Sequence, residues 1–296
     1  MDENLIAYQD YLIKEKNYSK LTLKAYVSDV ESFGVFLFDF HEGVQFVDVG
    51  YSLIRSWIVS LVESGVSNKT VNRKVSSLKS FYLFLLKIKV ITVNPLLKHK
   101  SLKVSKKVQV SFSEKEIKDV FELNDFSDDF DGVRDQLVIE LFYATGIRRA
   151  ELINLKLRNV DFSNKIIKVL GKRNKERILP LLKCTEVLLL KYIELRRMKV
   201  SEGFEDLLIL SKKGNKIGES FVYRLINDYF SAVSLKVKKS PHVLRHSFAT
   251  HLLNNGADLN SVKELLGHAS LSSTQIYTHS SLSELKKVYK DAHPRS

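Results

Sequence analysis

Apolar residues in the first hundred positions recur every three or four residues, which predicts helices. Ser19 can cap the first of these helices, Gly65 can end the second, and Asn68 opens the third. Asn94 and Pro95 then stop the helical pattern. The recurring apolar positions are Leu23, Tyr26, Val30 and Phe33, then Leu53, Trp57, Leu61 and Val62, then Val71, Val75, Leu78, Tyr82 and Leu85. Residues 1–97 are therefore predicted to form a small helical domain.

A polar, basic stretch follows, and we interpret residues 98–111 as a linker. Five lysines and no acidic residue occur between Lys98 and Lys107. Ser113 and Glu116 then have the spacing of a capping box, a frequent signal for the start of a helix. This signal marks the beginning of a second domain over residues 112–296.

The second domain mixes helical and strand patterns. Residues 133–143 have a helical pattern that runs into a turn at Thr145 and Gly146, and another helix begins at Arg148. Three short apolar runs separated by turn residues predict a small antiparallel sheet, at 160–162, 166–170 and 177–181. Further helices are expected at 184–199, 219–233, 242–254, 259–266 and 283–291. The fold class is thus mainly α with a small antiparallel β-sheet in the second domain.

The charge of the chain indicates a polyanionic partner. The net charge is +13; the first hundred residues hold 13 lysines and arginines against 10 acids, and the rest hold 34 against 24. A basic surface displaces counterions from nucleic acid and so favours binding, although a membrane surface or a merely basic soluble protein remain alternatives at this point. The chain has no apolar run long enough to span a bilayer and no signal-peptide pattern, and its single cysteine, Cys184, suits a reducing cytoplasm.

Several polar residues of the second domain suit the binding of a phosphate. Arg148 follows the turn at Gly146 and begins a helix, where backbone amides favour an anion and a guanidinium can grip two phosphate oxygens. A surface arginine paired with Glu151 is the alternative interpretation of this residue. His242 and Arg245 are three residues apart on one helix and can therefore reach one ligand.

Metal and nucleotide chemistry are not expected. His242 and His246 are four residues apart, as in zinc-protease helices, but no glutamate lies between them and Arg245 would repel a cation. The chain contains neither a phosphate-binding Gly-rich loop nor a dinucleotide fingerprint. A phosphoryl-transfer enzyme without metal must neutralise transition-state charge with its own cations, and a tyrosine can serve as its nucleophile.

The residues Arg148, His242, Arg245, His268 and Tyr277, in this order, resemble those of the tyrosine recombinase and phage integrase family, in particular the Xer recombinases. They fall where the family has its arginine, His-x-x-Arg pair, histidine and tyrosine. The motifs Leu-Leu-Gly-His, ending at His268, and Ile-Tyr-Thr-His, around Tyr277, are intact, and the resemblance covers essentially the whole chain. Each motif alone is weak, but five in order are specific.

The resemblance also implies a catalytic lysine in the turn of a β-hairpin. Lys172, directly after Gly171, is our choice, and Lys175 is the competing candidate. The family usually has a second glycine where this chain has Arg173, a change that can alter the turn. Glu151 matches an acidic position of the family, and we expect it to hold a catalytic cation in place.

The resemblance further implies a mechanism and an assembly. Tyr277 would form a 3′-phosphotyrosine link while Arg148, Arg245 and His268 bind the phosphate, Lys172 protonates the leaving 5′ oxygen, and His242 manages the proton of the tyrosine. An N-terminal SAM-like core-binding domain and a catalytic α+β domain would close round DNA as a C-shaped clamp. Four protomers, identical or paired, would act on two sites without a cofactor, with a DNA translocase as a further possible partner. The final helix, which carries Leu285 and Val288, would dock into a neighbouring protomer rather than onto its own domain.

Basic residues outside the catalytic set are expected to contact DNA. They are Lys69, Arg73, Lys74, Lys79, Lys103, Lys106, Lys107 and Arg173. Three other functions remain open: a type IB topoisomerase, a catalytically silent DNA-binding protein, and the integrase of a mobile element. The small helical first domain disfavours the topoisomerase, the complete catalytic set disfavours the silent protein, and the short chain favours the Xer type over an integrase.

Overall fold

The computed structural model describes residues 2–105, 110–171, 176–236, 238–267 and 288–295. The contacts within the chain divide it into two compact units, Met1–Lys107 and Val108–Ser296. Each unit has its own hydrophobic core. Among the described residues, no helix combines the length and the apolar character that a membrane span requires.

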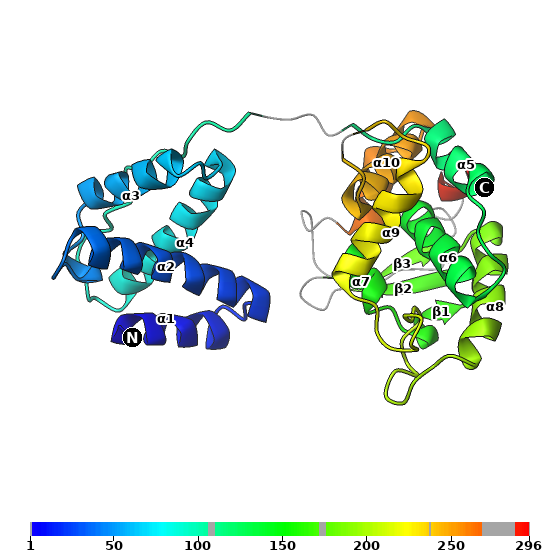
Figure 1. Cartoon of the computed structure of the whole chain (residues 1–296), viewed down its shortest axis with the longest axis horizontal. Helices are drawn as coiled ribbons and strands as arrows, with labels where there is room; N and C mark the ends of the chain where they lie inside the picture. The colour runs from blue at the N-terminus through cyan, green and yellow to red at the C-terminus, as the bar shows by residue number, and fades with distance from the viewer. Residues whose placement is uncertain (1, 106–109, 172–175, 237, 268–287, 296) are drawn as a thin grey trace. The chain divides into compact units, whose positions relative to one another are not determined.

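The first unit is helical (Figure 1). Ser19 and Ser67 cap the second and fourth helices by accepting hydrogen bonds from the backbone of Thr22 and Thr70. Aromatic side chains dominate the core, in which Phe33 packs against Trp57 with ring centroids 5.0 Å apart. The helices are α1 (Glu3–Lys14), α2 (Lys20–Phe40), α3 (Tyr51–Glu63) and α4 (Asn68–Lys87), with a 3₁₀ turn at Phe46–Asp48. The sequence pattern did not reveal α1, although Tyr8 and Leu12 bury one face of it.

The segment that follows α4 remains attached to the first unit. Leu96 is buried in its core. The amide side chain of Asn72 both donates to the Leu102 carbonyl and accepts from the Leu102 amide, at 2.9 Å in each case. Asn68 donates to the carbonyl of Lys103. Leu102 and Lys103, within the stretch that we interpreted as a linker, thus lie against the start of α4.

The second unit is built around one buried helix. Helix α6 (Phe130–Thr145) packs against α8 and α10, and all but three of its residues are buried (Figure 1). The capping box predicted at Ser113 and Glu116 is present at the start of α5. The other helices are α5 (Glu114–Leu123), α7 (Arg149–Ile153), α8 (Lys183–Arg197), α9 (Glu219–Ser231), α10 (Pro241–Asn254) and α11 (Leu259–Leu266), with a 3₁₀ turn at Leu157–Asn159. Residues 288–292 are also helical.

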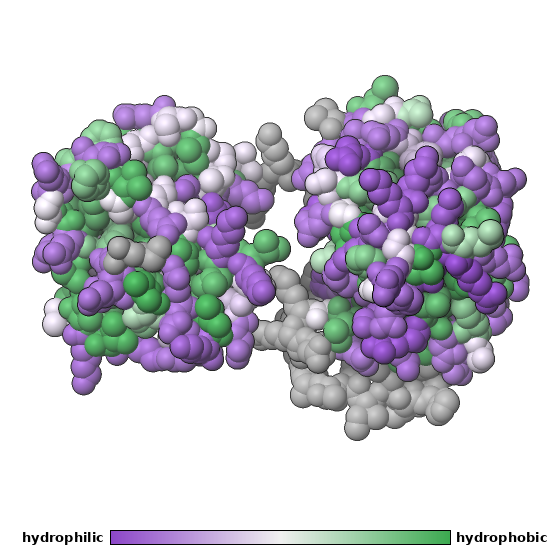
Figure 2. Space-filling model, turned by 60° about the horizontal axis from the view of Figure 1, so that its bottom comes forward, coloured by the Kyte–Doolittle hydropathy of each residue, from purple (hydrophilic) through white to green (hydrophobic). Residues whose placement is uncertain are grey.

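A three-stranded antiparallel sheet completes the second unit. Strands β1 (Val160–Asp161), β2 (Ile166–Leu170) and β3 (Glu176–Pro180) lie side by side in chain order. Ile167 pairs with Leu179, and Val169 pairs with Arg177. The order and the strand positions agree with the prediction to within one residue. The face of this unit visible in Figure 2 is largely covered by hydrophilic side chains, with apolar residues scattered among them.

Candidate active site

The turn after α6 presents Arg148 at the start of α7. Gly146 ends α6 in the left-handed conformation, with φ +56°, and a Cβ atom on it would lie 2.4 Å from Phe248. The backbone N–H of Arg148 donates to Glu151 Oε2 at 2.8 Å, and its Nη1 donates to Oε1 at 2.7 Å. The ion pair with Glu151 therefore exists, but Glu151 is buried, whereas 29% of the Arg148 side chain is exposed.

Helix α10 carries His242 and Arg245. Pro241 occupies its first turn, where the lack of an N–H costs nothing. Arg245 donates to the carbonyl of Gly146, in the turn that precedes Arg148, and its Nη2 donates to the carbonyl of Leu266 at 2.5 Å. The two arginines of the predicted set are thus held around the same turn.

The C-terminal end of α11 accepts hydrogen bonds from three arginines. Arg177 Nε donates to Leu265 O at 2.9 Å, Arg245 donates to Leu266 O, and Arg148 Nη2 donates to Gly267 O at 3.0 Å. The last carbonyls of a helix have no partner within the helix and form the negative end of its dipole, so guanidinium groups stabilise them. Since His268 follows directly, these bonds fix the backbone from which that histidine emerges.

The electrostatics of this cluster favour an anion. Burial would raise the pKa of Glu151, but hydrogen bonds and charge from Arg177, together with bonds from Arg148, lower it to about 2. Burial, followed by the charges of Arg148 and Arg177, lowers the pKa of Arg245 to about 9, so this group keeps its proton at neutral pH. One carboxylate therefore faces three guanidinium groups, and two positive charges remain for a ligand such as a phosphate.

His242 is suited to accept a proton. Desolvation and the positive charges of Arg149, Lys238 and Arg245 lower its pKa below the ordinary value of 6.5. The imidazole is therefore neutral at pH 7. Neutral imidazole is the form required of a general base.

Arg148 and Arg245 of the expected set thus lie around the same turn, Glu151 pairs with Arg148, and His242 lies one turn before Arg245 on α10. Lys172, Arg173, Lys175, His268, Tyr277 and Leu285 lie outside the described residues. The sequence analysis missed a role for Arg177, which it counted only within the third apolar run. The available signal was an arginine that shares the inward face of β3 with Leu179, a position where a strand normally places an apolar residue.

Two of the basic residues proposed to contact DNA have partners within the first unit. The carboxylate of Asp29, which is buried, accepts from Arg73 and Ser77 and lies 3.6 Å from Lys74 Nζ. Lys69, Lys79 and Lys103 have exposed side chains, whereas Lys106 and Lys107 lie outside the described residues. Arg73 remains half exposed, so its outer edge is accessible.

The end of the chain packs on the second unit. The Tyr289 side chain is fully buried and donates to the Ala144 carbonyl, near the turn that positions Arg148. Arg295 forms an ion pair with the buried Glu140 at 2.9 Å and stacks over Phe121. Residues 288–295 therefore pack on the second unit of their own chain. The exchange of this segment between protomers stays a prediction.

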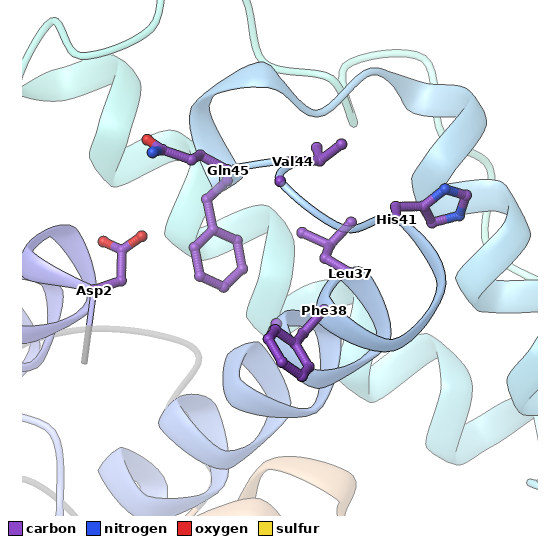
Figure 3. Close-up of a pocket in the computed structure, with 9 residues that line it drawn as sticks. Asp2, Leu37, Phe38, His41, Val44 and Gln45 are labelled. Carbon is purple, nitrogen blue, oxygen red and sulfur yellow. The ribbon is translucent and has the colours of Figure 1, made fainter.

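Two surface pockets of the described residues lie away from the arginine cluster. One, of about 340 Å³, lies between the start of α1 and the end of α2, where Figure 3 shows Asp2, Phe38 and Gln45 at its rim. Another, of about 490 Å³, is lined by residues that include Glu140 and Arg295. Neither contains Arg148 or Arg245.

Comparisons with known proteins agree across the chain. Residues 111–284 match the phage integrase family, and residues 5–89 match the phage integrase N-terminal SAM-like domain. Tyrosine recombinase XerC of Anoxybacillus flavithermus is 40% identical over 290 residues, covering 97% of this chain and 96% of that protein. Tyrosine recombinase XerC of Bacillus subtilis is 38% identical over 294 residues, covering 98% and 95%. The crystal structure of the XerH site-specific recombinase, bound to its difH substrate after cleavage, aligns with a TM-score of 0.73 at 22% identity over 94% of this chain and 78% of XerH.

Proposed function

The chain belongs to the phage integrase family and is a tyrosine recombinase, an enzyme that cleaves and rejoins DNA, and from this premise we propose that it resolves chromosome or plasmid dimers by site-specific recombination. The observation that supports the proposal most directly is the convergence of Arg148 and Arg245 on the end of α11, one residue before His268. We infer that these two guanidinium groups, together with His268, bind one phosphate.

Each residue has a defined part in the proposed reaction. Tyr277 attacks the scissile phosphorus, the bond from phosphorus to the 5′ oxygen breaks, and a 3′-phosphotyrosine forms. Lys172 protonates the leaving 5′ oxygen, and His242 takes the proton of the tyrosine. Arg148, Arg245 and His268 bind the non-bridging oxygens, where charge is redistributed in the transition state. Glu151 supports Arg148, and no cofactor takes part.

The covalent link makes the reaction reversible. Because the phosphodiester energy is kept in the tyrosyl ester, the 5′ hydroxyl of a second duplex can attack the ester and release Tyr277. Repetition on the other strand pair passes through a four-way junction. We expect four protomers, identical or paired with a second recombinase, on two DNA sites, each closing on its duplex as a C-shaped clamp. We further expect exchange of the C-terminal segment, activation by a DNA translocase, and action in the cytoplasm.

Additional DNA contacts are proposed for basic residues outside the catalytic set. Lys69, Lys79 and Lys103 of the first unit, with Arg73, Lys74, Lys106, Lys107 and Arg173, would bind the phosphate backbone and set affinity rather than sequence preference. A mobile-element integrase would use the same chemistry. Full-length relatives named XerC at 38–40% identity favour dimer resolution over integration.

The test uses a nicked duplex that carries the recombination site of the organism's replication terminus, placed so that cleavage releases a short fragment and cannot reverse. Wild type and Tyr277→Phe are compared on denaturing gels in the presence of EDTA. A covalent complex formed by wild type alone supports the nucleophile, the 3′ linkage and independence from metal. Tight binding without a covalent species would argue for a silent DNA-binding protein, and a band that persists in Tyr277→Phe would reject this nucleophile.

A further inference from the structure

Arg177 is a buried arginine, and each of its three guanidinium nitrogens donates a hydrogen bond. Only 4% of the residue is exposed. Its Nη1 and Nη2 atoms donate to the two carboxylate oxygens of Glu151, both at 2.8 Å, while Nε donates to the Leu265 carbonyl at 2.9 Å. Such a two-pronged pair fixes both partners in orientation as well as in distance. Because the group is buried and each of its three nitrogens already donates a hydrogen bond, it is not placed to touch DNA.

The position of Arg177 links three segments that carry proposed catalytic residues. It lies in β3, which follows directly on the segment that contains Lys172. Through Glu151 it reaches α7 and Arg148, and through Leu265 it reaches the end of α11, before His268. The approach to α11 is close, since a Cβ atom on Gly267 would lie 3.0 Å from Arg177 Cδ. One side chain therefore joins β3, the first turns of α7 and the end of α11.

The charges give Arg177 a second effect. Glu151 accepts hydrogen bonds from both Arg177 and Arg148. A buried carboxylate needs a positive partner, so without Arg177 the charge of Glu151 would be neutralised by Arg148 alone. Arg148 would then pair more closely with Glu151, and its guanidinium would interact less strongly with a phosphate. With Arg177 in place, the carboxylate is already neutralised and still orients Arg148.

We propose that Arg177 is a positioning residue for DNA cleavage: it neutralises Glu151 so that Arg148 stays available to the scissile phosphate, and it holds the end of α11 from which His268 emerges. The inference rests on the proposed function, and it adds a residue that acts through Glu151 and Leu265 rather than on the DNA. It predicts that the damage caused by loss of Arg177 depends on the charge of Glu151.

The experiment measures covalent-complex formation on the nicked substrate for wild type, Arg177→Lys, Arg177→Met, Glu151→Gln and the double variant Arg177→Met/Glu151→Gln. Arg196→Lys is the matched control, because Arg196 is another buried arginine of the second unit that donates to backbone carbonyls, among them Leu208, away from the cluster. DNA affinity and thermal unfolding are measured for every variant, and the cleavage rate is compared at a temperature where all are folded.

We expect Arg177→Lys to lower the cleavage rate about tenfold or more, and Arg177→Met to lower it further, with DNA affinity retained. The double variant should cleave faster than Arg177→Met, because removal of the carboxylate charge releases Arg148. A residue that only fills space predicts additive losses instead. Arg196→Lys should keep the wild-type rate.

The outcomes separate this inference from the function on which it rests. If wild type cleaves and Arg177→Lys cleaves equally well, or the double variant is no better than Arg177→Met, the inference is wrong and the proposed function stands. If Arg177→Met does not fold, Arg177→Gln and its double variant with Glu151→Gln, which likewise lack the positive charge at position 177, decide the same question. If wild type binds the site without cleaving it, the proposed function fails and the inference fails with it.

Discussion

Arg245 Nη2 donates to the carbonyl oxygen of Leu266 at 2.5 Å, which ties the second arginine of the proposed catalytic set to the end of the helix that precedes His268. Arg245 also donates to Gly146, two residues before Arg148. These two bonds use two of the five N–H groups of a guanidinium, and the others can meet phosphate oxygens. The same side chain thus orders the loops around the phosphate and retains donors for it.

The first prediction concerns Arg148 and Arg245. Replacement of either by lysine keeps the charge but removes the fork that bonds to backbone and phosphate together, so covalent-complex formation should fall by roughly 10²–10³-fold. The rate is measured on the nicked substrate at saturating protein. Arg158→Lys, an exposed arginine of the same unit, serves as the control and should have no effect. Equal rates for Arg245→Lys and wild type would remove Arg245 from the catalytic set.

The second prediction concerns pH. The pKa of His242 is lowered, so the imidazole is neutral above pH 6.5 and becomes protonated only as the pH falls through a value below the ordinary one. A protonated imidazole cannot accept the proton of Tyr277, and the cleavage rate should therefore be flat near pH 7 and decline on the acidic side. His242→Gln should be slower and lose this decline.

Variants of two neighbouring lysines, Lys238 and Lys239, provide an internal control for this pH profile. Lys238 is one of the groups that lower the pKa of His242, so Lys238→Met should move the acidic decline toward higher pH. Lys239→Met removes the adjacent lysine, which is not among the causes of the shift, and should move the decline less. A profile that responds equally to both variants would indicate a general effect of net charge.

The third prediction concerns Gly146. A Cβ atom there would meet Phe248 at 2.4 Å, and φ is +56°, so Gly146→Ala combines backbone strain with a clash beside the Arg245 contact. We expect a loss of unfolding free energy greater than the roughly 1–2 kcal/mol of the backbone term alone, together with slower cleavage. Gly256→Ala isolates the backbone term, because Gly256 has φ +90° with no atom within 4 Å of its Cβ position. Urea unfolding of both variants gives the comparison.

The fourth prediction concerns the buried Asp29 of the first unit. Asp29→Ala removes the carboxylate that accepts from Ser77 and pairs with Arg73 and Lys74, so the unfolding free energy should fall by about 1–3 kcal/mol. Asp39→Ala, an exposed position on the same helix, is the control and should change little. If Arg73 also binds DNA, the Asp29→Ala protein should keep its affinity for the site once its stability is taken into account.

Regular patterns of apolar residues predicted much of the fold. An element that is buried on all sides has no such pattern and was predicted less well. Three short apolar runs and the turn residues between them predicted the sheet, which the structure contains as β1, β2 and β3. Helix α6 is buried around its circumference, so its sequence has little helical periodicity, and its ends lay beyond the predicted 133–143. Helix α1 buries Leu5, Tyr8 and Leu12 at helical spacing, but the apolar residues Ile6 and Ile13 lie outside that face and are exposed, which blurs the pattern.

The candidate site divides in the same way. Arg148 and Arg245 belong to short motifs and could be found by their spacing. The pairing of Arg177 with Glu151 joins residues 26 positions apart. Such a bond depends on how β3 is placed against α7, and no local pattern encodes that placement. An inward-facing arginine on a strand was the only local trace of it.

The last prediction decides between Lys172 and Lys175 as the general acid. A leaving 5′ oxygen needs a proton, whereas a 5′ sulfur in a bridging phosphorothiolate leaves readily as a thiolate. Loss of the general acid should therefore slow cleavage of the ordinary substrate by about 10²–10⁴-fold and slow the sulfur substrate far less. We expect this rescue for Lys172→Ala. Lys175→Ala should change both substrates to a similar, smaller extent, and the reverse pattern would assign the role to Lys175. A variant that is equally slow on both substrates acts on the phosphate or on folding, because sulfur rescues only the step in which the leaving group is protonated.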